Sequence, residues 1–169
     1  MKNYAIVPLD TSHHKSEFSC GQPMLDNYLI KQAKQDVKRK LSVCFVLADS
    51  EGVVLGFYTL SSTSISRKLL TEEIRKKLPP NYKDLPATLL GRLAIDKKMA
   101  GNGFGELLLV DALKKSFETA SSSIGSMAVI VDPIDDNAVR FYQKYGFILL
   151  PDSGKMFLPM ATISLLFDA

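Results

Sequence analysis

The sequence predicts a single α/β domain with a mixed sheet, and three observations lead to that fold class. The 169 residues are 46% hydrophobic and 23% charged, which fits one compact domain with a sizeable core. Strand-like and helix-like segments follow one another along the whole chain. No internal repeat, low-complexity tract or long linker interrupts them, so we expect one domain over residues 1–169.

The expected strands contain alternating, β-branched or aromatic residues. Residues 42–48 and 53–60 lie on either side of the turn segment "DSEG", which favours an antiparallel hairpin. The segment 88–96 carries Arg92 in its middle, so we expect one face of that strand to be incompletely buried. In chain order, the sequence predicts strands at 4–10, 42–48, 53–60, 88–96, 126–132 and 147–151, and a last strand within 155–167.

The expected helices have amphipathic spacing and recognisable ends. Pro23 suits a first helical turn, and Leu25, Tyr28, Leu29 and Gln32 share a stripe of an amphipathic helix. Pro79 stops a short helix that precedes it. The sequence predicts helices within 18–40, 71–78, 105–120 and 135–146.

Composition excludes several classes of protein. No stretch approaches the roughly 18 apolar residues of a membrane span, and the N-terminus lacks the zones of a signal peptide. We therefore expect a cytoplasmic protein that does not bind a membrane. Cys20 and Cys44 form no CxxC pair, and His13 and His14 have no ligand spacing, so neither a disulfide framework nor a metal site is expected.

A glycine-rich segment, "AGNGFGE" at residues 100–106, lies between an expected strand and an expected helix. Glycines let a ligand approach main-chain N–H groups, and such groups at the start of a helix bind anions. The spacing excludes a P-loop, because the lysine and the hydroxyl of GxxxxGK[ST] are absent. It weakens a dinucleotide fingerprint, because Glu106 replaces the third glycine, although Asp132 ends the next strand as a ribose-binding acid would. A pyrophosphate with a long thin arm, as in coenzyme A, remains, and a flexible turn with a helix cap is the purely structural alternative.

The loop and several other segments resemble one known family. The loop is similar to that of the GNAT superfamily of acyl-CoA N-acyltransferases, with Ala100 in place of the usual Gln or Arg. The segment "DNAVRFYQKYGF" resembles the second signature of that superfamily. More specifically, "FSCGQPMLDNYL", "LPATLLGRLAID" and "LPMATI" resemble the GNAT toxins of bacterial toxin-antitoxin modules. The resemblance spans nearly the whole chain and implies a GNAT fold, with a mostly antiparallel central sheet of six to seven strands flanked by about four helices.

The resemblance also implies the cofactor, acetyl-CoA, and the roles of individual residues. Tyr142 would give a proton to the departing thiolate, although its helical spacing with Phe141 and Tyr145 would equally suit a core residue. A backbone N–H of the strand 93–95 would polarise the thioester carbonyl. The implied cofactor-binding residues are Leu93, Ala94, Ile95, Ala100, Gly101, Asn102, Gly103, Phe104, Gly105, Glu106, Asn137 and Phe141.

Basic residues are the candidates for contacts with a polyanionic substrate. The chain has 21 basic and 18 acidic residues, a mild excess that permits such a partner without requiring one. A solvated helix face explains the same pattern without any function. The candidates for RNA binding are Lys31, Lys34, Lys38, Arg39, Arg75, Lys76 and Arg92.

The function that the resemblance implies is acetylation of the α-amino group of aminoacyl-tRNA, which blocks translation. The implied partners are a ribbon-helix-helix antitoxin and a second copy of the chain in a homodimer. Two alternatives remain: an acetyltransferase for a small amine or a protein N-terminus, and a non-catalytic protein that binds coenzyme A.

Overall fold

The computed structural model describes residues 3–167 and contains a seven-stranded sheet in the order β1-β2-β3-β4-β5-β7-β6. The pairs β1/β2, β2/β3, β5/β7 and β6/β7 are antiparallel, whereas β4 and β5 are parallel. The expected mixed, mostly antiparallel sheet is thereby confirmed. The strands are β1 (Tyr4–Pro8), β2 (Val43–Asp49), β3 (Val54–Ser66), β4 (Asp84–Ile95), β5 (Ala128–Val131), β6 (Ile148–Leu149) and β7 (Met156–Pro159).

The helices include one more than the sequence predicted. The first helix is continuous but contains a π turn, η1, between its two α-helical halves. The helices are α1 (Pro23–Asn27), η1 (Tyr28–Gln32), α2 (Ala33–Lys38), α3 (Glu72–Lys76), α4 (Phe104–Ser122), α5 (Asp136–Lys144) and α6 (Met160–Phe167), with short 3-10 turns η2 (Arg67–Leu69) and η3 (Lys97–Met99).

The last segment of the chain corrects the expectation of a strand throughout 155–167. The strand β7 ends at Pro159, which has no N–H to continue the ladder, and α6 begins at the next residue. Met160 and Ile163, three residues apart, are the buried positions of α6. A short apolar run does not distinguish a strand from a buried helix by its period, which explains the error.

The described residues form two compact units, and β3, β4 and α4 each continue from one unit into the other. The first unit comprises 3–61 and 90–112, and the second comprises 62–89 and 113–167. Within residues 3–167, none of the helices combines the length and apolarity that a membrane span needs.

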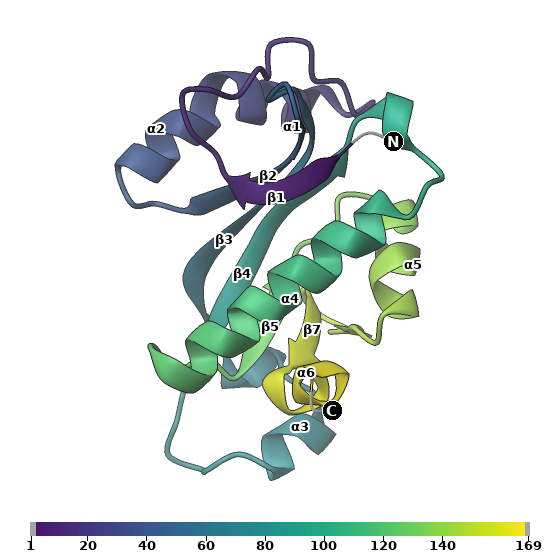
Figure 1. Cartoon of the computed structure of the whole chain (residues 1–169). Helices are drawn as coiled ribbons and strands as arrows, with labels where there is room; N and C mark the ends of the chain where they lie inside the picture. The colour runs from purple at the N-terminus through teal and green to yellow at the C-terminus, as the bar shows by residue number, and fades with distance from the viewer. Residues whose placement is uncertain (1–2, 168–169) are drawn as a thin grey trace. The chain divides into compact units, whose positions relative to one another are not determined.

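The core of the first unit lies between the first helix and the strands β2 and β3. In Figure 1 the helix runs beside β1 and β2. The helix contributes Leu25, Tyr28 and Leu29, which are expected stripe positions, and Ala33. Gln32, the fourth expected position, is exposed, because the π turn holds an extra residue and Ala33 takes the buried place after it. Their neighbours in this core are Phe18, Cys44, Val46, Ala48, Val54, Phe57 and Ala94.

Helix α4 packs closely on β3 and β4 in the first unit because β3 has a glycine at the contact. A Cβ atom on Gly56 would lie 2.8 Å from Cδ1 of Ile95, 3.0 Å from Cδ1 of Leu108 and 3.2 Å from the carbonyl oxygen of Ala94. Real Cβ atoms essentially never lie as close as 2.8 Å to another atom, so any larger residue at this position would force Ile95 or α4 to shift. The close packing fixes the position of α4 relative to the end of β4.

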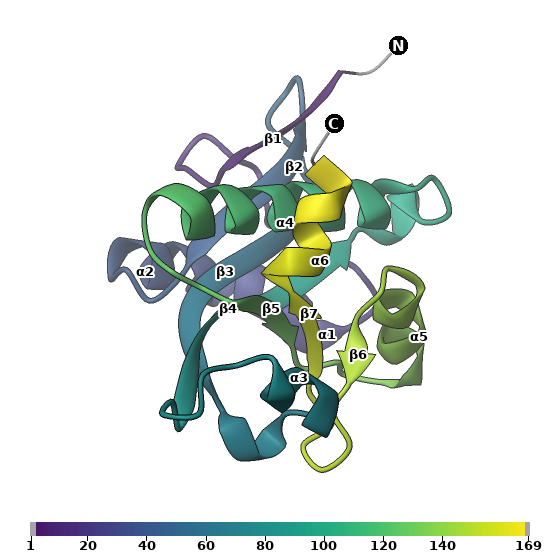
Figure 2. The ribbon, with the colours of Figure 1, turned by 90° about the horizontal axis from the view of Figure 1, so that it is seen from below.

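The second unit has its own core, built around β5 and β7. Figure 2 shows β7 between β5 and β6, with α5 before β6 and α6 after β7. All four residues of β5 are buried, as expected for the apolar segment 126–132. The core of this unit contains Ile65, Leu70, Leu85, Ala87, Ala128, Ile130, Leu150 and Phe157.

Candidate active site

The strand β4 carries the first set of predicted site residues, Leu93, Ala94 and Ile95. Its pairing with β5 runs through Thr88 and Leu89, and the predicted residues lie further along the strand, in the first unit. Ala94 is buried in the core, while Leu93 and Ile95 are half-buried. The strand ends at Ile95, and the N–H of the next residue, Asp96, donates to the carbonyl of Leu55 at 2.9 Å.

Asp96 fixes the start of the glycine loop, a role that the sequence did not suggest. Its side chain, in a residue only 2% exposed, accepts hydrogen bonds from the N–H groups of Ser19 at 3.1 Å and Lys98 at 3.0 Å. The N–H of Lys97 in turn donates to the carbonyl of Ser19 at 2.9 Å. Ser19 is distant in sequence, so no local pattern could have revealed this contact.

The glycine loop has the backbone conformation of an anion-binding turn. Gly101 and Gly103 both have φ of +79°, a left-handed conformation that side chains other than glycine adopt at a cost. No atom lies within 4 Å of the place where a Cβ would stand on either glycine, so the loop faces open space. The residues therefore fit a ligand that approaches the main chain.

Helix α4 begins at Phe104, directly after these glycines. The first intrahelical hydrogen bond at its start runs from the N–H of Leu107 to the carbonyl of Gly103, at 3.1 Å. The N–H groups of Phe104, Gly105 and Glu106 accordingly have no carbonyl partner in the helix. They point outward at the positive end of a 19-residue helix, where a phosphate is stabilised.

The other residues of the loop affect its shape and its charge. The side-chain amide of Asn102 donates to the carbonyls of Met99 and Ala100 at 3.4 and 3.3 Å. The ring of Phe104 packs edge-on against Tyr4, with centroids 5.3 Å apart. Ala100 is exposed and offers no polar group where the family pattern has Gln or Arg, and the exposed Glu106 adds a negative charge to the first turn.

Helix α5 carries the predicted residues of the second unit. The carboxylate of Asp135 caps the helix by accepting from the N–H of Ala138 at 2.8 Å. Asn137 is exposed in the first turn, and its side-chain oxygen accepts a hydrogen bond from Arg140. Phe141 packs edge-on against Tyr142 and Tyr145, in both cases with ring centroids 5.2 Å apart.

Tyr142 has a buried ring and a hydroxyl that reaches solvent. The residue is 8% exposed, and its ring packs against Phe147. Within residues 3–167 its hydroxyl has no hydrogen-bond partner, yet no fully enclosed side-chain oxygen or nitrogen in that range lacks one, so this hydroxyl is not enclosed. Burial raises the pKa of Tyr142 above its ordinary value, so the phenol keeps its proton at neutral pH.

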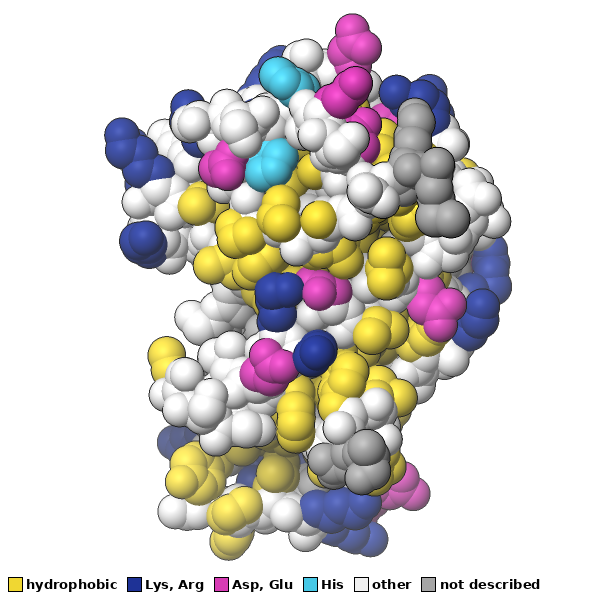
Figure 3. Space-filling model, in the orientation of Figure 1, with side chains coloured by type: hydrophobic (Ala, Val, Ile, Leu, Met, Phe, Trp, Pro, Cys, Tyr) yellow, Lys and Arg dark blue, Asp and Glu magenta, His cyan; other side chains and the backbone are white. Residues whose placement is uncertain are grey.

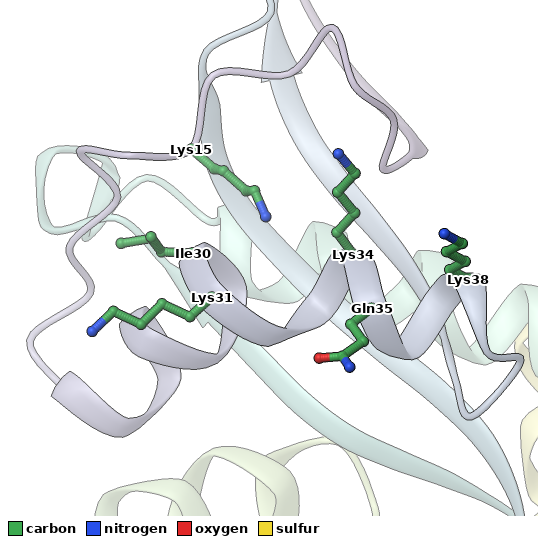
Figure 4. Close-up of a pocket in the computed structure, with 6 residues that line it drawn as sticks. All are labelled: Lys15, Ile30, Lys31, Lys34, Gln35 and Lys38. Carbon is green, nitrogen blue, oxygen red and sulfur yellow. The ribbon is translucent and has the colours of Figure 1, made fainter.

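The basic candidates of the first unit lie on the first helix or close to it. Lys31, Lys34 and Lys38 line one cavity, as Figure 4 shows. Arg39 is exposed at the end of α2. Arg92 differs from them, because its guanidinium carbon lies 3.5 Å from the centroid of the Tyr28 ring, as in a cation-π contact.

The basic candidates of the second unit, Arg75 and Lys76, both have partners within the protein. The guanidinium of Arg75 donates to the carbonyl of Leu70 at 2.6 Å, so it stabilises the segment before α3. Lys76 lies 3.8 Å from the carboxylate of Glu72 one turn earlier, and both side chains are exposed. Exposed pairs of this kind are weak, so Lys76 is free to change partners.

Lys15 is a basic residue that the sequence did not single out. It lies in the irregular segment between β1 and α1 and lines the same cavity as Lys34 and Lys38. A lone lysine in a loop carries no periodic signal, so only the fold brings it to the other two.

Comparisons with known proteins support the same kind of site as this geometry. The family described as an acetyltransferase (GNAT) domain matches residues 84–160, which include β4, the glycine loop and Tyr142. These features define the class of an acetyltransferase that uses acetyl-CoA. A protein of Mycobacterium tuberculosis (strain ATCC 25618 / H37Rv) called a tRNA-acetylating toxin is 38% identical over 136 residues, which are 80% of this chain and 79% of that protein.

Two solved structures resemble the chain over nearly its full length. The toxin AtaT complexed with acetyl-methionyl-tRNAfMet is 29% identical, with a TM-score of 0.88, and the match covers 99% of this chain and 100% of that one. A mutant AtaT bound to the C-terminus of the antitoxin AtaR and acetyl-CoA is 26% identical, with a TM-score of 0.83 and coverages of 98% and 99%. The chain belongs to the GNAT family of tRNA-acetylating toxins, as its sequence resemblance implied.

Proposed function

We propose that this protein transfers the acetyl group of acetyl-CoA to the α-amino group of an aminoacyl-tRNA and thereby blocks translation. The observation that carries the proposal is the 38% identity to a named tRNA-acetylating toxin. The likeness to AtaT with acetyl-methionyl-tRNAfMet over 99% of the chain supports the same substrate class. The two units would then act together as one domain over residues 1–169.

The cofactor would be held mainly by main-chain groups. The loop 100–106 offers its N–H groups to the pyrophosphate, with Gly101 and Gly103 providing the backbone turn. The strand residues Leu93, Ala94 and Ile95 would bind the arm and polarise the carbonyl, and Asn137 and Phe141 would contact the arm from α5. Because these contacts are mostly to backbone, Ala100 can stand in place of a polar residue without removing the site.

The chemistry requires a neutral amine, a polarised carbonyl and a proton for the thiolate. Bound acetyl-CoA supplies the acetyl group, so that the amine nitrogen forms the new C–N bond while the C–S bond breaks. A backbone N–H of the strand 93–95 would stabilise the negative charge on the carbonyl oxygen. The Tyr142 hydroxyl would give its proton to the leaving sulfur, and the nitrogen would lose one proton to water. An α-amine, with a reference pKa of about 7.7 to 8.0, is partly neutral near pH 7 without a protein base.

The RNA would meet basic side chains. The candidates are Lys31, Lys34, Lys38, Arg39 and Arg92 of the first unit, with Lys76 and, less readily, Arg75 of the second. Contacts of this type recognise phosphates and RNA shape more than sequence.

The likeness to AtaT bound to the C-terminus of an antitoxin supports an antitoxin partner for this protein as well. We expect that antitoxin to be a ribbon-helix-helix protein and the toxin to be a homodimer in the cytoplasm. Translation in bacteria takes place there, and the substrate is found there.

One assay tests the proposal directly. Purified protein is incubated with acetyl-CoA and a full set of charged tRNAs, and the aminoacyl ends are then analysed for N-acetylation by mass spectrometry. We expect acetylation of at least one aminoacyl-tRNA. Turnover on polyamines or peptides without any acetylated aminoacyl-tRNA would contradict the substrate, and no turnover on any amine would favour a non-catalytic coenzyme-binding protein.

A further inference from the structure

Three lysines converge on a concave surface of the first unit, between the segment after β1 and the first helix. Lys15, Lys34 and Lys38, called here the lysine triad, line two adjacent cavities of about 340 and 390 Å³. In Figure 4, Lys15 extends from the N-terminal segment toward the helix, while Lys34 and Lys38 rise from the helix on the side of that segment. The triad is therefore the shared wall of the two cavities.

The charges of the triad are not paired with carboxylates in the described part of the chain. No carboxylate among residues 3–167 forms an ion pair with any of the three lysines. Asp10 lines the larger cavity and brings one negative charge, which hydrogen bonds from the N–H and hydroxyl of Ser12 hold at 2.8 and 2.5 Å, so the three lysines still leave the lining with a net positive charge. Three like charges facing one hollow create a local positive potential that attracts an anion.

Lys15 is the most constrained member of the triad. Its ammonium donates to the carbonyl of Leu29 at 2.9 Å, which holds it against the helix. Burial lowers its pKa, and the nearby charge of Lys34 lowers it as well. A bound anion would relieve both effects, because it favours the charged form of each amine.

The larger cavity has both apolar and polar walls. Leu9 and Val37 supply apolar surface, and the imidazole of His13 stands beside them with its side chain 6% exposed. Nδ1 of His13 accepts the N–H of Asp10 at 3.0 Å, so Nε2 carries the proton of the neutral ring. Figure 3 shows a histidine beside hydrophobic side chains, with basic side chains at the edge formed by α2.

From this geometry we propose that the lysine triad binds a backbone phosphate of the substrate RNA, with the ribose or base of the same nucleotide against Leu9, Val37 and His13. Lysine binds phosphate as a point charge, and unpaired RNA bases stack on aromatic and apolar side chains. An acidic peptide would use the same charges, but it would leave the apolar wall without a planar or sugar partner. The inference rests on the proposed function, since it names where that substrate is held.

The test measures binding of uncharged tRNA by fluorescence anisotropy at several salt concentrations, so that it is independent of catalysis. Lys34→Gln and Lys38→Gln should each weaken binding several-fold, about three- to tenfold at low salt, and each should reduce the salt slope by about one. Lys114→Gln, which removes an exposed lysine of α4 outside the cavities, is the matched control and should bind tRNA as the wild type does. Circular dichroism of each variant establishes that it is folded.

Further measurements distinguish a failure of the lysine triad as an RNA-binding site from a failure of the proposed function. In the acetylation assay, the cavity variants should raise the KM for charged tRNA and leave the KM for acetyl-CoA unchanged. If the wild type acetylates tRNA but Lys34→Gln and Lys38→Gln match Lys114→Gln in affinity and salt slope, the triad does not bind the RNA. If these variants lose an acidic antitoxin peptide but keep their affinity for tRNA, the cavity is a protein-binding site. A wild type that binds tRNA at the triad but acetylates none contradicts only the proposed function.

Discussion

At the scale of single residues, Tyr142 shows why a helical pattern left two interpretations open. Its spacing with Phe141 and Tyr145 suits a core residue, and the ring is indeed buried. Its hydroxyl, however, is not enclosed and has no partner within residues 3–167. The core interpretation is therefore correct for the ring, and the hydroxyl is left available for the proposed role of proton donor. Periodicity reports where a Cβ points, and it says nothing about the far end of a long side chain.

Removing the Tyr142 hydroxyl should damage catalysis without damaging the fold. We expect Tyr142→Phe to lower kcat about 100-fold or more, because a positioned general acid contributes roughly 10² to 10⁴ in rate. The KM for acetyl-CoA should change little, since the ring and its packing remain. Steady-state kinetics with charged tRNA measure both constants.

Tyr145→Phe is the matched control for this change. Tyr145 also packs against Phe141 but has no proposed part in the chemistry, so its variant should keep nearly the wild-type kcat. An unchanged kcat in Tyr142→Phe would remove Tyr142 from the role of acid.

At the scale of elements, residues that cap helices were a better guide to the secondary structure than apolar runs were. Thr71 and Asp135 cap α3 and α5 through their side chains, and both helices were predicted. The apolar run of α6 has no polar face to set its period, and it was taken for a strand. Contacts such as that of Asp96 with Ser19 depend on the tertiary fold, so no pattern within a segment could predict them.

The glycine loop offers a prediction that separates cofactor binding from stability. Gly101→Ala should raise the Kd for acetyl-CoA at least several-fold, because alanine at φ of +79° costs about 1–2 kcal/mol and shifts the N–H groups. Gly154→Ala introduces similar backbone strain, at φ of +74°, in open space far along the chain. Calorimetric titration should show weakened binding in the first variant and not in the second. Equal affinities in the two variants would show that the loop is only a turn.

The packing of α4 on the sheet gives a prediction about stability alone. We expect Gly56→Ala to destabilise the protein by about 1–3 kcal/mol, because its Cβ would overlap Ile95 and Leu108. Gly125→Ala is the control, since nothing lies within 4 Å of its Cβ position. Urea unfolding of the three proteins measures the difference. A Gly56→Ala variant as stable as Gly125→Ala would mean that α4 can move away from β3 at little cost.

At the scale of the whole molecule, the fold class and nearly the full order of elements could be predicted from the sequence. Composition indicated a real core, and periodicity located the strands and the long helix α4. The resemblance added the sheet and the enzyme class, both of which are confirmed. The residues that the fold alone brings together, such as Lys15 and α2, could not be predicted because their proximity arises from pairing and packing over long sequence separations.

Three buried tyrosines should make the whole protein sensitive to alkaline conditions. Burial raises the pKa of Tyr28, Tyr58 and Tyr142, and the 2.6 Å hydrogen bond from Tyr58 to Asp111 raises the pKa of Tyr58 further. Above pH 10 the unfolded tyrosines lose protons that the native ones keep, so the free energy of unfolding falls as pH rises. The fall approaches about 1.4 kcal/mol per pH unit for each such group.

Denaturant unfolding between pH 8 and about 11 measures this slope. Tyr58→Phe should cost about 1–2 kcal/mol at neutral pH by losing one hydrogen bond, and it should make the alkaline slope shallower. The variant of the exposed Tyr82, Tyr82→Phe, should retain the wild-type slope. If the free energy of unfolding of Tyr58→Phe falls with pH as steeply as that of the wild type, Tyr58 is not a source of the pH dependence.

The π turn at Tyr28–Gln32 has a consequence for how this family can diverge. A π turn holds one residue more than the α-helical turn it replaces, so deleting a residue there would restore an ordinary helix. Because the π turn already spreads that extra residue over one turn, such a deletion would leave α2 close to its present orientation about the helix axis. A deletion in α1, outside the π turn, would instead rotate Lys34 and Lys38 by about 100° away from Lys15. A change of length at the π turn would therefore preserve the proposed RNA contacts of this helix, whereas a change of length in α1 would move them, and the proposed acetyl-transfer residues on β4 and α5 would stay in place in both cases.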